Sequence, residues 1–179
     1  MIERAFKLGV GIVLAILIAC EPLPGTGADG GAASSEGGSG SCALEGQYVM
    51  QATQYKASGG TYCNKLLTEL SATTRAGETL VFTKIDATTY QSKVVGTINP
   101  GLSWTLDTST CQLRNTSSDV VDSTDSAGAP VKVKLDGLTF AKLDGTTLTI
   151  TSSSSITSAT QGAQGFPCQL DSSQTGTKK

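Results

Sequence analysis

The chemistry open to this chain of 179 residues is limited first by its lack of the commonest catalytic base. The chain has no histidine, which excludes every catalytic arrangement that uses an imidazole base and removes the commonest metal ligand. A serine hydrolase would then need a Ser–Lys pair, and Ser92 and Lys93 are neighbours in the sequence. Because adjacent residues of a strand point to opposite faces, we expect these two not to act together. The sequence predicts no catalytic residues, no cofactor and no enzyme activity. The alternative is an enzyme that uses carboxylates alone, which would need two or more Asp and Glu residues in one cleft.

Three aspartates are the next candidates for chemistry. Asp119, Asp122 and Asp125 are spaced by three residues, and their carboxylate oxygens are of the type that Ca²⁺ prefers. The stretch does not match the EF-hand pattern D-x-[DN]-x-[DN]-G. We therefore favour a solvated loop between strands over a calcium site, and predict no metal site in the chain.

One cysteine, Cys20, ends the most hydrophobic segment. Residues 1–7 carry a small positive excess, and residues 8–19 are uncharged and apolar. This run is shorter than the roughly 20 residues that a membrane-spanning helix needs and is typical of the hydrophobic region of a signal peptide. Its last residues and the cysteine, LIAC, resemble the lipobox of bacterial lipoproteins in order and spacing.

The resemblance implies a lipid-anchored protein. The thiol of Cys20 would receive a diacylglyceryl group, and a signal peptidase would cut between Ala19 and Cys20. Acyl chains, as in palmitate, at about 0.8 kcal/mol per buried methylene would then hold the protein on a membrane. Glu21 is not the Asp that retains such proteins at the inner membrane, which favours the outer membrane of the bacterial cell envelope. An uncleaved anchor and a plain secretory signal are the alternatives.

The remaining chain divides by composition. Residues 1–19 are the expected signal peptide, and residues 20–41 comprise Cys20 and a Gly/Ser-rich segment without periodic apolar positions, which predicts a flexible tether. Its reach would be about 25 Å. We expect a β-rich domain over residues 42–172 and a disordered tail over residues 173–179.

Four further cysteines lie in the predicted domain: Cys42, Cys63, Cys111 and Cys168. An even number in an exported domain predicts two disulfides, for which three pairings exist. We expect Cys42–Cys63, which flank the first predicted strand, and Cys111–Cys168, which share the sequence Cys-Gln-Leu. A metal site is the weaker alternative, because no C-x-x-C pair and no histidine are present.

The fold class follows from a period of two in the apolar residues, which is typical of half-buried strands. About eight short strands predict an all-β, antiparallel sandwich or small barrel. The clearest predicted strands are Gln47–Tyr55, Leu80–Ile85, Tyr90–Ile98, the alternation at Leu102, Trp104 and Leu106, and that at Val131, Val133 and Leu135.

Three segments are less regular. The sequence KLDG occurs at 134–137 and at 142–145, and Asp-Gly favours tight hairpin turns. We therefore expect two turns that bracket a short strand, Leu138–Leu143. Residues 64–74 have leucines at helical spacing that also alternate, and we favour a strand. The serine-rich run at 151–160 fits either a strand or a loop.

Two features suggest binding. The sequence Gly46-Gln47-Tyr48 resembles the Gly-x-Trp motif of the first lipocalin strand, with Tyr in place of Trp, which would imply a barrel that carries a small apolar ligand. Trp104, the only tryptophan, lies between Leu102 and Leu106 on one strand face, so we expect it in the core rather than on a binding surface.

The sequence thus favours a lipid-anchored envelope protein whose β domain is a non-enzymatic structural or interaction module. Its partners would be the membrane, through the lipid, and an envelope protein or glycan. The net charge of −2 supplies no basic footprint for nucleic acid. The alternative function is a lipocalin-like carrier. The oligomeric state does not follow from the sequence.

Overall fold

The computed structural model describes residues 42–73, 76–98 and 101–179. These residues form nine strands and one helix: β1 (Gly46–Met50), β2 (Gln54–Gly59), α1 (Thr61–Thr73), β3 (Thr79–Lys84), β4 (Thr89–Val94), β5 (Leu102–Asp107), β6 (Gln112–Thr124), β7 (Pro130–Asp144), β8 (Thr147–Ser158) and β9 (Cys168–Lys178).

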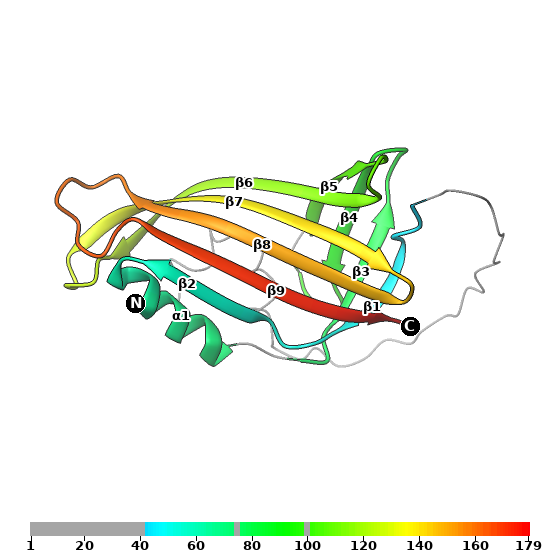
Figure 1. Cartoon of the computed structure of the whole chain (residues 1–179), viewed down its shortest axis with the longest axis horizontal. Helices are drawn as coiled ribbons and strands as arrows, with labels where there is room; N and C mark the ends of the chain where they lie inside the picture. The colour runs from blue at the N-terminus through cyan, green and yellow to red at the C-terminus, as the bar shows by residue number, and fades with distance from the viewer. Residues whose placement is uncertain (1–41, 74–75, 99–100) are drawn as a thin grey trace.

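The strands form a closed antiparallel barrel. β1 pairs with β3, each strand from β3 to β9 pairs with the next, and β1 also pairs with β9, which closes a ring of eight strands. β2 is a ninth strand that lies outside this ring (Figure 1). It continues the line of β1 along β9, where β1 pairs with Gly176–Lys178 and β2 with Cys168–Ser173. The prediction of an all-β sandwich or small barrel is confirmed, as a barrel.

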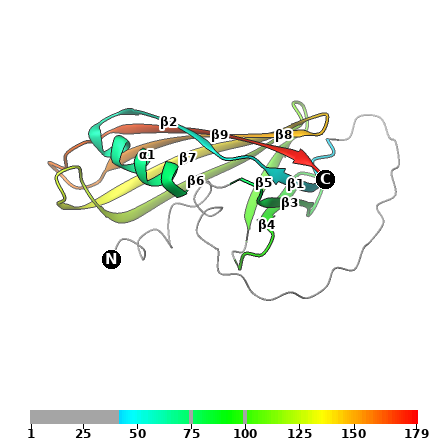
Figure 2. The same ribbon diagram turned by 90° about the horizontal axis from the view of Figure 1, so that it is seen from below.

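Strand length decides the shape of the molecule. The strands β1, β3, β4 and β5 have 5 or 6 residues, whereas β6 to β9 have 11 to 15. At about 3.3 Å per residue, the long strands extend well beyond the short ones. The barrel therefore occupies one end, and at the other end β6-β7-β8-β9-β2 continue as an open sheet (Figures 1 and 2).

Helix α1 lies against the open sheet, so our prediction of a strand over residues 64–74 is wrong. Tyr62, Cys63, Leu66 and Leu70 are buried on one side of the helix, at the i, i+3 and i+4 spacing of a helical face. They pack in a cluster with Val131, Val133, Ile156 and Cys168, which we call the helix cluster. The open sheet needs an apolar cover, and a helical face supplies it (Figure 2).

The predicted first strand, Gln47–Tyr55, is in fact two strands. β1 pairs on both sides, with β3 and with β9, whereas β2 pairs only with β9. Residues 51–53 lie between them, where the chain passes from the barrel to the open sheet, and the N–H of Gln51 still donates to Thr175 O at 2.7 Å. β1 and β2 therefore follow one another along β9, with β1 inside the ring and β2 outside it.

The end of the chain also differs from the prediction. Residues 173–178, expected in a disordered tail, form the last part of β9 and pair with β8, β1 and β2. The composition of residues 173–179 is polar, but β9 closes the barrel through its pairing with β1. Ring closure thus orders a segment whose own sequence shows little apolar periodicity.

Only one of the two Asp-Gly pairs makes a turn. Asp144 pairs with Thr147 across a hairpin, and Gly145 has φ of 59°. The other pair lies inside β7, where Gly137 pairs with Ser117 of β6 and Ser154 of β8. A Cβ at Gly137 would lie 2.8 Å from Ser117 Oγ, so this glycine permits close packing between strands. The predicted short strand at 138–143 is part of β7, and the serine-rich run is part of β8.

Candidate functional site

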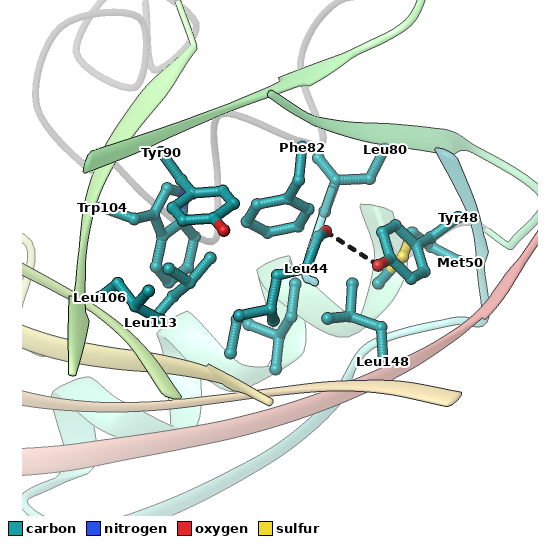
Figure 3. Packing of buried hydrophobic residues seen from close by; sticks show 12 residues of the cluster. Leu44, Tyr48, Met50, Leu80, Phe82, Tyr90, Trp104, Leu106, Leu113 and Leu148 are labelled. Atoms are coloured by element: carbon teal, nitrogen blue, oxygen red, sulfur yellow. Dashed lines mark hydrogen bonds between the residues drawn. The ribbon is translucent and has the colours of Figure 1, made fainter. Parts of the chain in front are cut away.

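The interior of the barrel is filled with side chains. Leu44, Tyr48, Met50, Leu80, Phe82, Tyr90, Trp104, Leu106, Leu113, Ala141, Leu148 and Ile150 form one buried group, the barrel cluster (Figure 3). The ring of Phe82 lies 6.0 Å from that of Tyr48, edge to face, and 5.6 Å from that of Trp104. These are the separations of favourable aromatic pairs. The large rings occupy the space in which a lipocalin-like barrel would hold a ligand.

Ser92 and Lys93, the neighbours considered for a catalytic Ser–Lys pair, lie on opposite faces of β4. Ser92 is buried in the barrel, where its Oγ accepts a hydrogen bond from Trp104 Nε1 at 2.8 Å. Lys93 is exposed on the opposite face of β4. The predictions that Trp104 belongs to the core and that the two side chains point apart are both confirmed. Ser92 serves as the hydrogen-bond partner that a buried indole N–H requires.

Residues 42–45 close one end of the barrel. The side chain of Leu44 is 1% exposed and belongs to the barrel cluster. Tyr48 Oη donates to Leu44 O at 2.9 Å, and Tyr90 Oη donates to Cys42 O at 3.0 Å. Burial, with a smaller effect of Tyr90, raises the pKa of Tyr48 to about 12. The segment that follows the predicted tether is therefore an integral part of the barrel.

The motif Gly46-Gln47-Tyr48 lies at this closed end. Gly46 begins β1, and Tyr48 points into the barrel toward Leu44 (Figure 3). The C-terminus lies at the same end, because Lys179 N donates to Gln47 O at 2.9 Å. We call it the closed end of the barrel. The opposite end of the molecule consists of two tip loops, residues 125–129 and 159–167.

All four cysteines of the domain form disulfides, but with a different pairing from the one we expected. The bonds are Cys42–Cys111 and Cys63–Cys168, with Cα–Cα distances of 5.1 and 5.7 Å. Cys42 and Cys63 lie at opposite ends of the β1–β2 line, too far apart to pair. Two disulfides indicate an extracytoplasmic domain, because cytosolic thiols are kept reduced.

Each disulfide secures a different irregular segment. Cys42–Cys111 joins the segment that closes the barrel to the connection between β5 and β6. Cys63–Cys168 joins the first turn of α1 to the start of β9, and both of its cysteines are buried in the helix cluster. The partners of each bond are separated by 69 and 105 residues, so only the tertiary structure brings them together.

The three aspartates do not converge on one point. Asp122 is exposed and forms an ion pair with Lys132 at 2.8 Å, Asp119 lies on the opposite face of β6, and Asp125 is buried beyond the strand. We expected all three in a loop, but β6 contains two of them. The described residues contain no group of three or more acidic or cysteine side chains arranged to hold a metal ion.

Asp125 instead joins the two tip loops. Its Oδ1 accepts hydrogen bonds from Ala127 N and Ala129 N, both at 2.9 Å, and its Oδ2 accepts one from Gln164 N at 3.0 Å. These backbone donors, Gln164 first, lower the pKa of Asp125. The sequence Asp-Ser-Ala-Gly signals the local turn, but nothing in it indicates the contact with Gln164.

We expect Asp125→Asn to destabilise the protein at neutral pH, because one carboxylate oxygen becomes an amide that faces the Gln164 N–H. The lowered pKa of Asp125 means that its contribution is present above the usual aspartate pKa and is lost as the pH falls through the lower, folded-state value. The difference in unfolding free energy between wild type and Asp125→Asn should therefore be smaller in acid than at neutral pH. Urea unfolding at pH 7 and pH 3 measures it.

Asp122→Asn is the matched control, because it removes a carboxylate from the same strand end but from an exposed ion pair. Its effect should stay within about 1 kcal/mol. Equal losses for the two variants at pH 7 would contradict the role assigned to Asp125.

The predicted lipidation and cleavage positions, Ala19 and Cys20, lie outside the described residues, as does the tether. Within residues 42–73, 76–98 and 101–179, no helix is long and apolar enough to cross a membrane. Cys42, which follows the predicted tether, is at the closed end of the barrel. No family model, curated protein or solved structure matches the chain.

Proposed function

We propose that this protein is a lipid-anchored lipoprotein of the bacterial envelope, outer membrane rather than inner, in which the barrel is a non-enzymatic structural or interaction module. The LIAC sequence at residues 17–20 supports the anchor. The two disulfides agree with export. The expected envelope partner is a protein or a glycan.

The filled barrel is the observation that carries this proposal. A carrier needs an apolar cavity of several hundred Å³, whereas here the rings of Tyr48, Phe82 and Trp104 pack against one another inside the barrel. A segment that would have to move for a ligand to enter, residues 42–45, is tied to Cys111 and hydrogen-bonded to Tyr90. Recognition is therefore assigned to the outer surface.

Trp104 reports directly on the carrier alternative. We expect its fluorescence emission to be blue-shifted, as for a buried indole, and unchanged on addition of fatty acids or an apolar dye. A saturable change in emission at micromolar ligand would instead favour the lipocalin-like carrier.

The anchor is tested by Cys20→Ser. We expect this substitution to abolish labelling by a fatty-acid analogue and to leave an unprocessed chain, because the thiol that accepts the lipid is absent. Labelling is followed in intact cells by gel fluorescence. Ser39→Ala, in the same segment, is the matched control and should be labelled as wild type. Persistent labelling of the Cys20→Ser chain would refute the lipoprotein assignment.

A further inference from the structure

One long edge of the open sheet has no partner strand within the described residues. β5 pairs with β6 only from Gln112 to Arg114. At the point where the two strands separate, Asn115 Nδ2 donates to Ser103 O at 2.6 Å. From there to Thr124, β6 pairs with β7 alone. We call residues 115–124 the open edge; it follows the outer side of β6 (Figure 1).

The open edge has few of the features that usually prevent edge-to-edge pairing. Asp119 places one charge on its inner face, and α1 reaches its last two residues, where Lys65 Nζ donates to Thr124 Oγ1 at 2.9 Å and Tyr62 Oη lies 3.0 Å from Ser123 Oγ. Edge strands are commonly protected by lysine, proline, a bulge or a covering segment. Residues 115–124 contain no lysine, arginine or proline, and every one of them is in continuous register with β7. Unpaired backbone groups in such a strand can accept another extended strand as a sheet neighbour.

An exposed valine lies at the middle of this edge. Val120 is 58% exposed on the outer face of the sheet. The other exposed large apolar side chains of the described residues, Ile85, Val95 and Ile98, lie in connections between strands. Val120 is therefore the one apolar side chain of this kind that a neighbouring strand would cover.

We propose that the open edge pairs with the open edge of a second copy of this chain, antiparallel, with Val120 on the two-fold axis. Identical strands that meet through the same edge must run antiparallel, and residues directly opposite each other must lie on the same face. Pairing about Val120 uses Thr116 to Thr124 of both copies. It joins the two open sheets into one continuous sheet, and the contact is isologous.

The side chains of the edge select this register. Pairing about Val120 sets the two exposed valines opposite each other, whereas pairing about Val121 would set each Val120 opposite Asp122. Pairing about Val120 sets Ser118 opposite Asp122 and Asp119 opposite Val121, so that no carboxylate directly faces another. Pairing about Asp119 would set two carboxylates opposite each other, which is unfavourable. Pairing about Ser118 would bring Arg114 into the contact, although Arg114 is already paired with Thr105 of β5.

The first test is cross-linking of the full chain in intact cells. Two Val120→Cys chains would place their thiols directly opposite each other, at a distance a disulfide can bridge. We expect mild oxidation to give about tenfold more covalent dimer for Val120→Cys than for Val95→Cys. Val95 is the matched control, because it is also 58% exposed but lies in the β4–β5 connection.

The second test measures the mass of the purified chain, in detergent, by sedimentation. We expect a dimer for wild type and for Val95→Lys, and a monomer for Val120→Lys, because two ammonium groups would face each other at the axis. A circular dichroism spectrum equal to that of wild type shows that Val120→Lys is folded.

A monomeric wild type would overturn the proposal, and so would a Val120→Lys chain that remains dimeric. A Val120→Cys chain that cross-links no better than Val95→Cys, or that cross-links to a different protein, would also overturn it. The mass of the purified chain does not depend on the lipid anchor, so the sedimentation test can fail or hold independently of the proposed function.

Discussion

The Phe82→Ala variant is expected to lose about 3–5 kcal/mol of unfolding free energy. Phe82 is 2% exposed and contacts the rings of Tyr48 and Trp104 at the centre of the barrel cluster. Truncation removes the buried apolar area and leaves a cavity that the surrounding strands cannot fill, because hydrogen bonds on both sides hold them in a closed ring. This loss is a large part of the stability of an ordinary domain, about 5–15 kcal/mol.

Urea unfolding followed by the fluorescence of Trp104 measures this effect, because Trp104 contacts the substituted side chain. Ile85→Ala is the matched control, since Ile85 follows directly after the same strand and is 58% exposed. Its effect should stay within about 0.5 kcal/mol. A loss for Phe82→Ala no larger than that would show that the barrel is loosely filled, and would reopen the carrier alternative.

Removal of the Cys63–Cys168 bond by alanine at both positions is expected to cost about 2–5 kcal/mol. The bond closes a segment of 105 residues, which restricts the unfolded chain strongly. It also joins the first turn of α1 to β9 inside the helix cluster. The structural effect of removing this bond should be confined to α1 and the helix cluster, because the barrel cluster includes neither cysteine.

Hydrogen exchange distinguishes this expectation from a general loss of stability. In the Cys63/Cys168 variant the amides of α1 should lose most of their protection, while those of β3 to β5 keep theirs. The Cys42/Cys111 variant is the control, because its bond closes 69 residues and secures the closed end of the barrel instead. Equal loss of protection in α1 for both variants would contradict the separate roles of the two bonds.

The lengths of the strands determine which surfaces this protein can present to a partner. Four short strands close the barrel, and four long strands leave it. The long strands create both the sheet that α1 covers and the open edge at residues 115–124. A strand at 115–124 was not predicted, because a run of serine, threonine and aspartate has weak apolar periodicity.

Features that depend on neighbours in the chain could be predicted from the sequence. The alternation at Leu102, Trp104 and Leu106 places Trp104 in the core, and that at Val131 and Val133 gives a half-buried strand, both as observed. Ser92 and Lys93 point apart because side chains alternate along any strand. The all-β class follows from the period of two in the apolar residues, and the presence of two disulfides follows from the number of cysteines.

Features that depend on distant segments were decided by the tertiary structure alone. The helix over Thr61–Thr73 forms because the open sheet offers an apolar face to its leucines, although the same residues also alternate. Gly137 is not in a turn because β6 and β8 both pair across it. The cysteines pair across 69 and 105 residues according to which strands become neighbours. Local periodicity sets which face of a strand is buried, but strand order and length set what lies against that face, and these arise only when the ring closes.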